Sequence, residues 1–229
     1  MKSKLLKLIA LGATGTRLLA LLAIGVVSAS VVAAPVIYSQ PENSVTGSAS
    51  QSGVPATSYD DFTFANGATI TDVHWHGAFS PGAQASQITA FTIQFWNTVA
   101  GVPGTAASAP QTFAGNAGQS NPHGCIGGLT CFDYSLDLTT SFHATAGTRY
   151  WVSIVPTFGF PPQWFWESGS GGNGVSFIEI LGTRATQPFD LAFDLTGTPD
   201  GAVVPEPATI ALLGIGLAGL GFARRRTLN

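Results

Sequence analysis

The sequence predicts an all-β protein built as an antiparallel β-sandwich of jelly-roll type. Apolar and polar residues alternate with a period of two in many short runs between Pro35 and Pro207. No apolar pattern with the helical period lasts three turns in that region, and joints rich in Gly, Pro and Ser separate the runs. About eight short strands with polar outer faces favour two packed sheets.

The first segment, residues 1–34, has the features of a secretory signal peptide. Its basic residues are Lys2, Lys4, Lys7 and Arg17. An apolar run, Leu18–Val27, follows and is short for a membrane span, and small residues come after it. An uncleaved membrane anchor is the alternative, and either interpretation sends the chain to the membrane for export.

Residues 35–57 are rich in Ser, Gly, Pro and Gln and offer few apolar side chains for packing. We therefore predict a disordered linker there. The pattern changes after it, and residues 58–200 form the predicted β-sandwich domain. Its expected strands are Tyr59–Phe64, Thr69–Phe79, Ile88–Trp96, Cys131–Leu138, Thr148–Val155, Gln163–Glu167, Gly174–Leu181 and Phe189–Leu195.

Two cysteines, Cys125 and Cys131, enclose a short loop that contains two adjacent glycines. In an oxidising compartment a pair this close predicts a disulfide bond. A metal site or a reactive thiol is the alternative, but five intervening residues do not match the usual metal-ligand spacing.

His74 and His76 flank Trp75 on an expected strand, so the two imidazoles share the face opposite the indole ring. With Asp72 on the same side they have the ligand types of a zinc or copper site. We interpret them instead as polar residues of a solvated strand face, with a metal site as the weaker alternative. We expect no cofactor and no catalytic residues, since the motifs of serine hydrolases, zinc proteases and phosphate-binding loops are absent from the sequence.

The aromatic-rich stretch 158–166 is the strongest candidate for ligand binding. Trp164 and Trp166 share one strand face, with Gln163 and Glu167 beside them. Exposed indole rings stack on sugars, and neighbouring polar groups bond hydroxyls, so the four residues are a candidate carbohydrate platform. Packing of the rings in the core is the alternative, and we favour it.

Charge is distributed unevenly along the chain. Between Pro35 and Pro207 there are twelve acidic residues and only two basic ones, Arg149 and Arg184, which gives a net charge near −10. Such a surface repels nucleic acids and anionic lipid headgroups. We therefore expect no nucleic-acid partner.

The C-terminal segment, residues 201–229, contains three parts in a fixed order. Val204, Pro205, Glu206 and Pro207 come first, the uncharged stretch 208–223 follows, and Arg224, Arg225 and Arg226 come last. As a helix, the stretch 208–223 would measure about 24 Å, at or just under the thickness of a bilayer core. The three arginines would stop it on the cytoplasmic side.

This order of parts resembles the PEP-CTERM sorting signal of Gram-negative bacteria. The resemblance implies processing by exosortase, passage through the inner membrane, and delivery to the cell surface or to an extracellular matrix of polysaccharide. A plain tail anchor with one membrane span is the alternative. The runs Asp60–Phe64, Ala68–Val73, Ile88–Ile93 and Gly101–Thr105 also resemble an exported bacterial module similar to jelly-roll carbohydrate-binding folds.

Three classes of function stay open at this point. The first is a non-enzymatic exported surface or matrix protein, linked to exopolysaccharide and biofilm. The second is a carbohydrate-binding module that uses the aromatic platform. The third is a metal-dependent hydrolase that uses His74 and His76. We expect the first, with the export machinery and an exosortase-like enzyme as partners.

Overall fold

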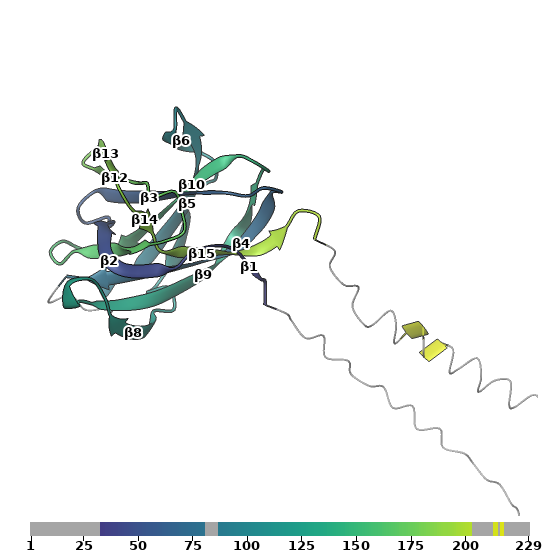
Figure 1. Ribbon diagram of the computed structural model, residues 1–229. Helices are drawn as coiled ribbons and strands as arrows, with labels where there is room; N and C mark the ends of the chain where they lie inside the picture. Colours follow the sequence, from purple (N-terminus) through teal and green to yellow (C-terminus); the bar gives the residue numbers. More distant parts are fainter. Residues whose placement is uncertain (1–32, 81–86, 203–212, 215, 218–229) are drawn as a thin grey trace, which may run out of the picture. The chain divides into compact units, whose positions relative to one another are not determined.

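The computed structural model describes residues 33–80, 87–202, 213, 214, 216 and 217. Within them the chain forms two antiparallel sheets (Figure 1). The eight strands of the first sheet are β1 (Val36–Gln40), β2 (Glu42–Ala49), β4 (Ala68–Phe79), β8 (Ser120–Gly124), β9 (Thr130–Ala144), β11 (Trp164–Gly169), β14 (Asp190–Leu191) and β15 (Phe193–Pro199).

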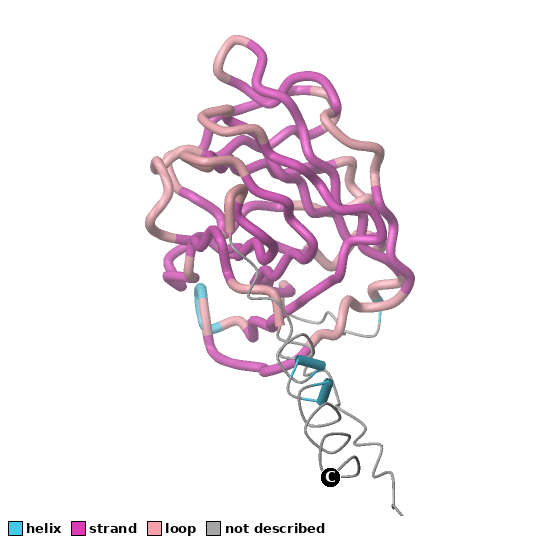
Figure 2. The backbone as a smooth tube through the Cα atoms, turned by 90° about the vertical axis from the view of Figure 1, so that its right-hand side faces the viewer, coloured by secondary structure: helices cyan, strands magenta, loops and turns pink. Residues whose placement is uncertain are grey.

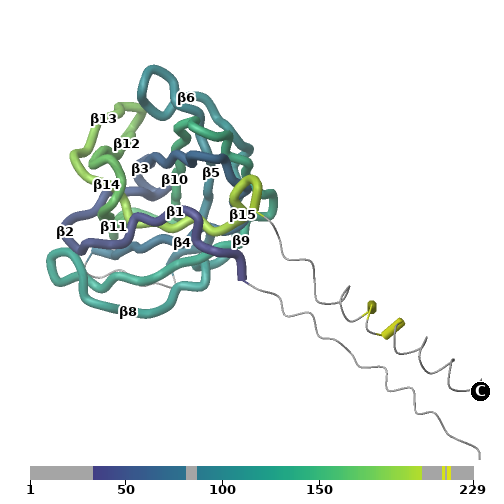
Figure 3. Tube along the Cα trace, turned by 45° about the vertical axis from the view of Figure 1, so that its right-hand side comes forward, coloured from purple at the N-terminus to yellow at the C-terminus, as the bar shows by residue number. Residues whose placement is uncertain are grey.

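The second sheet lies above the first in Figure 1, and the turned view of Figure 3 separates the same two layers. Its seven strands are β3 (Ala56–Thr63), β5 (Ala90–Val99), β6 (Val102–Ala106), β7 (Gln111–Ala114), β10 (Arg149–Thr157), β12 (Ser176–Ile180) and β13 (Thr183–Gln187). The 3-10 turn η2 (Ile126–Gly128) follows β8. Figure 2 shows that strands account for most of the described part of this domain.

Strand β4 is the centre of the first sheet. It pairs with β9 along one side, and with β15 and then β11 along the other. Strand β2 continues the sheet beyond β11, and β1 continues it beyond β15. Because Val36 of β1 lies opposite Thr196 of β15, the first and last strands of the domain meet at one edge of the sheet.

The core lies between the two sheets and is rich in aromatic side chains. Trp75 stacks on Tyr134 with ring centroids 5.5 Å apart, and Phe91 of the second sheet contacts both rings. Phe95 and Phe142 stack across the layers at 4.3 Å. Alternation along the strands places these rings inward, which confirms the predicted β-sandwich architecture. The jelly-roll assignment stays a prediction.

All eight predicted strands have counterparts, with ends displaced by a few residues, but the run predicted as one strand at Phe189–Leu195 is divided into β14 and β15. The largest difference is β9, which continues to Ala144. Four strands were not predicted within the sandwich domain, namely β6, β7, β8 and β13. They are short, and most of their side chains are exposed or half-buried, so they carry little of the apolar alternation by which strands are recognised.

The prediction of a disordered linker at residues 35–57 is wrong, because β1 and β2 lie within it. Tyr38 packs on the ring of Phe193, but most of the buried side chains of this segment are polar and pair with partners in the core. Ser48 contacts Ser58 of β3 at 2.5 Å, and Ser50 donates to the carbonyl of Ile154 at 2.6 Å. The side-chain Oε1 atom of Gln51 accepts from the backbone amide of Trp164 at 2.7 Å. Buried hydrogen bonds therefore replace the apolar pattern that the prediction required.

Several predicted features lie outside the described residues. They are residues 1–32 of the signal peptide, the motif Val204–Pro207, most of the stretch 208–223, and Arg224, Arg225 and Arg226. Of the stretch 208–223, Leu213, Gly214, Gly216 and Leu217 are described, and these four are helical and exposed. No helix among the described residues is long and apolar enough to cross a membrane.

The predicted disulfide between Cys125 and Cys131 is confirmed, with the two Cα atoms 5.7 Å apart. Cys131 begins the buried part of β9, and the register pairs it with His123 of β8. The bond thus closes the short loop that contains η2 and fixes that loop to the end of the β8–β9 pair.

The candidate carbohydrate platform at Trp164 and Trp166 is not formed, and the core packing that the sequence analysis favoured is confirmed. Both side chains are 0% exposed. Trp164 lies against Phe91 and Tyr134, while the Trp166 indole donates a hydrogen bond to the carbonyl of Ala192 at 2.8 Å. No ring face of either residue is left for a sugar.

The disulfide generates a first prediction. Replacing both Cys125 and Cys131 by serine should lower the free energy of unfolding by less than about 3 kcal/mol, because the loop that the bond closes is short. Urea unfolding of the exported protein would measure this loss. Thiol labelling of the same protein, denatured without reductant, should detect no free cysteine; two labelled thiols would contradict the bond.

The buried tryptophans generate a second prediction. Trp166→Ala should lower the free energy of unfolding by about 3–5 kcal/mol, since it removes a fully buried indole. Phe160→Ala is the matched control, because that ring belongs to the same aromatic stretch but is 54% exposed. The control should change stability by no more than about 0.5 kcal/mol. Equal losses in the two variants would argue against the burial of Trp166.

Candidate functional site

A cluster of histidine and carboxylate side chains lies on the outer face of the first sheet. His76 of β4 and Asp133 of β9 are direct partners across two neighbouring strands. Each follows or precedes a core aromatic residue, Trp75 or Tyr134, so strand alternation turns both polar side chains outward. The His76 Nδ1 atom lies 2.9 Å from a carboxylate oxygen of Asp133.

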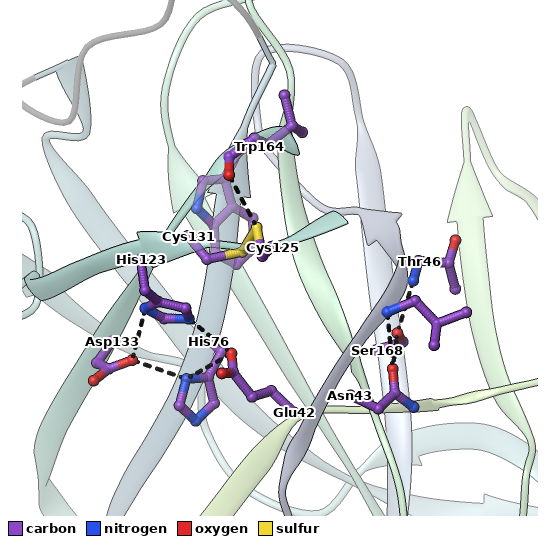
Figure 4. Close-up of a disulfide and its surroundings, with 12 residues drawn as sticks. Glu42, Asn43, Thr46, His76, His123, Cys125, Cys131, Asp133, Trp164 and Ser168 are labelled. Carbon is purple, nitrogen blue, oxygen red and sulfur yellow. Dashed lines mark hydrogen bonds and ion pairs between the residues drawn. A yellow bond between two sulfur atoms is a disulfide. The ribbon is translucent and has the colours of Figure 1, made fainter. Parts of the chain in front are cut away.

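Two further residues reach this pair from the edges of the sheet. Glu42 is the first residue of β2, and His123 lies on β8. One oxygen of Glu42 lies 2.9 Å from His123 Nε2 and 3.5 Å from His76 Nδ1. Figure 4 shows the Glu42 carboxylate between the two imidazole rings, with Asp133 on the other side of them and the disulfide nearby.

Glu167 of β11 is the buried member of the cluster. Its carboxylate lies within 4.8 Å of a ring nitrogen of His123 and of the Cys131 sulfur. The side chain is 0% exposed, and neither of its oxygens has a hydrogen bond of normal geometry. Burial and the neighbouring carboxylate of Glu42 raise the pKa of Glu167 to about 7.

The pKa values of Glu42 and His123 are shifted in opposite directions. Burial raises the pKa of Glu42, but its hydrogen bond with His123 and the nearby imidazoles outweigh burial, so the pKa lies below its usual value. The pKa of His123 is raised, first by the hydrogen bond of its Nδ1 to the carbonyl of Asn121 and also by Glu42. These shifts show that the groups interact strongly.

The structure separates the two histidines that the sequence analysis grouped. His74 does lie on the same strand face as His76, but its Nε2 atom pairs with Asp72 at 2.8 Å. That contact raises the pKa of His74. His143 pairs with Asp200 and belongs neither to the cluster nor to the His74–Asp72 pair. Only His76 of the sequence-predicted pair therefore belongs to the cluster.

Sequence reasoning missed Glu42, His123 and Asp133 as partners of His76. They come from three strands, and only the register of the sheet brings them together. Glu167 was singled out, but as part of the carbohydrate platform. Of that platform, Gln163 bonds to Gln51 and to its neighbouring backbone instead. One usable signal for His123 was its position two residues before a disulfide cysteine, which fixes its loop.

The cluster contains the ligand types of a cation site. Glu42, His76 and His123 each offer one ligand atom, and these three atoms all lie within 4.8 Å of one another. Imidazole nitrogen and carboxylate oxygen are the ligands that zinc and similar divalent metals take in proteins. Cys131 cannot contribute its sulfur as a thiolate, because that sulfur is in the disulfide.

Comparison with known proteins finds two matches along the chain. The family model described as "Domain of unknown function (DUF7901)" matches residues 36–195. The model of the PEP-CTERM protein-sorting motif matches residues 203–226, which include Val204, Pro205, Glu206 and Pro207. No curated protein and no solved structure matches the chain. The first match covers more than half of the sequence, so the chain belongs to the family of the DUF7901 domain and carries a C-terminal PEP-CTERM sorting motif.

Proposed function

We propose that this chain is an exported, non-enzymatic protein of the cell surface or extracellular matrix, delivered by its PEP-CTERM tail and associated with exopolysaccharide in a biofilm. In this proposal residues 1–34 are the signal peptide and the stretch 208–223 crosses the inner membrane transiently. An exosortase-type enzyme processes the chain at the motif Val204–Pro207. The DUF7901 domain is then the part that remains outside.

The observation that carries the proposal is the match of residues 203–226 to the PEP-CTERM protein-sorting motif. This motif implies processing by exosortase-type machinery and export toward the cell surface of a Gram-negative bacterium. Here it follows within a few residues of the end of β15 at Pro199. The folded domain and the sorting motif are therefore adjacent in the chain.

Three properties of the domain support export. The disulfide between Cys125 and Cys131 is a bond that forms and persists in oxidising compartments outside the cytoplasm. The first and last strands meet at one edge, an arrangement that suits a domain connected to the membrane from one end. The net charge near −10 of residues 35–207 suits an aqueous environment and discourages binding to anionic surfaces.

The structure does not place the residues of the two alternative functions as those functions require. A carbohydrate-binding platform required exposed rings at Trp164 and Trp166, which are buried. A hydrolase using His74 and His76 required both imidazoles at one ion, but the two bind different carboxylates. We therefore keep the surface or matrix protein as the proposed function.

The tail generates a third prediction. Replacing Pro205, Glu206 and Pro207 by alanine should leave export intact but retain the full-length protein in the inner membrane. The two prolines keep the segment extended and accessible to a processing enzyme, and Glu206 must stay in water because a carboxylate in the bilayer core is costly. Cell fractionation, with mass spectrometry of the C-terminus, measures both effects.

A matched control replaces Thr227, Leu228 and Asn229 by alanine, because these residues lie beyond the matched range 203–226. The control should be processed like the parent. Deleting residues 208–229 should instead release the domain into the periplasm or the medium. Normal processing of the Pro205–Pro207 variant would contradict the proposal and favour a plain tail anchor.

A further inference from the structure

We infer that Glu42, His76 and His123, together with Asp133 and Glu167, form a binding site for one divalent transition-metal ion of the zinc type. This site lies on the outer face of the first sheet and is independent of the sorting motif. It goes beyond the proposed function, which requires no metal.

The spacing of the ligand atoms fits such an ion. In a tetrahedral zinc site with metal–ligand bonds of about 2.0–2.2 Å, neighbouring ligand atoms lie about 3.3–3.6 Å apart. The Glu42 oxygen lies 2.9 Å from His123 Nε2 and 3.5 Å from His76 Nδ1. Small side-chain rotations would therefore suffice to place an ion between the three groups. All three side chains are partly exposed, which leaves the ion a path from solvent.

Glu167 is a second and independent observation. Its carboxylate is buried, lies within 4.8 Å of a ring nitrogen of His123, and has no hydrogen-bond partner of normal geometry. A buried carboxyl group that neighbours a second carboxylate, that of Glu42, and has no hydrogen bond of normal geometry is unusual in a folded protein and demands an explanation. A bound cation beside His123 supplies one, because the carboxylate would then be a ligand or the charge partner of the ion.

Side-chain cations other than the histidines do not balance these carboxylates. The two arginines within residues 35–207 pair elsewhere, Arg149 with Asp61 and Arg184 with Glu179. Glu42, Asp133 and Glu167 therefore converge on two imidazoles alone. A bound divalent ion would compensate the negative charge of these three converging acidic side chains.

The surrounding hydrogen bonds hold the ligands in orientations suited to an ion. The Nδ1–H group of His123 donates to the carbonyl of Asn121 at 2.8 Å, so Nε2 is the ring nitrogen that faces Glu42. Without an ion, a proton on Nε2 makes the 2.9 Å contact with the Glu42 oxygen, and a metal ion would replace that proton. The Asn121 side-chain amide donates to Asp133 at 2.8 Å. Metal-binding histidines commonly have such an outer partner. Two imidazoles favour zinc, copper or nickel over calcium and magnesium, which prefer oxygen ligands.

The test uses the full-length chain purified in mild detergent without a polyhistidine tag, stripped with chelator and titrated with Zn²⁺ alone. The parent should bind one ion per chain by calorimetry and by elemental analysis after dialysis, and Zn²⁺ should raise its melting temperature. His76→Ala and His123→Ala should each weaken binding by at least about tenfold. Co²⁺ in place of Zn²⁺ should give visible absorption typical of a tetrahedral site in the parent and not in His123→Ala.

His74→Ala is the matched control, because this histidine lies on the same face of β4 but pairs with Asp72. It should bind Zn²⁺ like the parent. Glu42→Gln keeps the size of the side chain but removes its negative charge. This variant should therefore bind Zn²⁺ more weakly without loss of fold, which circular dichroism would verify. Binding of less than one ion, or equal affinity in the parent, His74→Ala and His123→Ala, would overturn the inference.

Discussion

Aromatic packing between the two sheets is the contact on which the rest of this structure depends. Trp75 of β4 stacks on Tyr134 of the adjacent β9 with an interplanar angle of 7°, and Phe91 of the opposite sheet lies 5.0 Å from Trp75. Trp164 of β11 contacts the same two residues, Phe91 and Tyr134. Each such pair contributes about 0.5–1.5 kcal/mol beyond the burial of its area. Together these rings fix which face of three neighbouring strands points inward.

The rings that fix which side chains point into the core also fix which side chains point to the outer face of the sheet. Because side chains alternate along a strand, the residue beside each core aromatic must point away from the core. His76 follows Trp75, Asp133 precedes Tyr134, and Glu167 follows Trp166. The core aromatics of β4, β9 and β11 therefore align three polar side chains on the other side of the sheet. The cluster is a geometric consequence of the same packing that holds the two sheets together.

The alternation of apolar and polar residues was enough to predict the central strand and the direction of its side chains. It failed where buried hydrogen bonds replaced apolar burial. The strand at Thr69–Phe79 and the outward direction of His76 followed from Val73 and Trp75, which are both 0% exposed. Strand β2 was missed because Ser48, and Ser50 just after the strand, are buried with hydrogen bonds rather than with apolar contacts. The partners of His76 were missed because a strand's own pattern does not reveal its register, and Glu42, His123 and Asp133 meet only through pairing between strands.

The inferred ion site lies where two poorly buried strands meet the strands that hold the aromatic core. Strand β8 has only exposed or half-buried side chains, and β2 buries little more than Ser48, whereas β4, β9 and β11 hold the aromatic core. Glu42 and His123 come from the two poorly buried strands, while His76, Asp133 and Glu167 come from the three well-packed ones. An ion bound by both groups would connect weakly anchored segments to rigid strands, and its binding energy would add to folding stability. The disulfide stabilises the connection between β8 and β9, because it fixes the residues that follow His123.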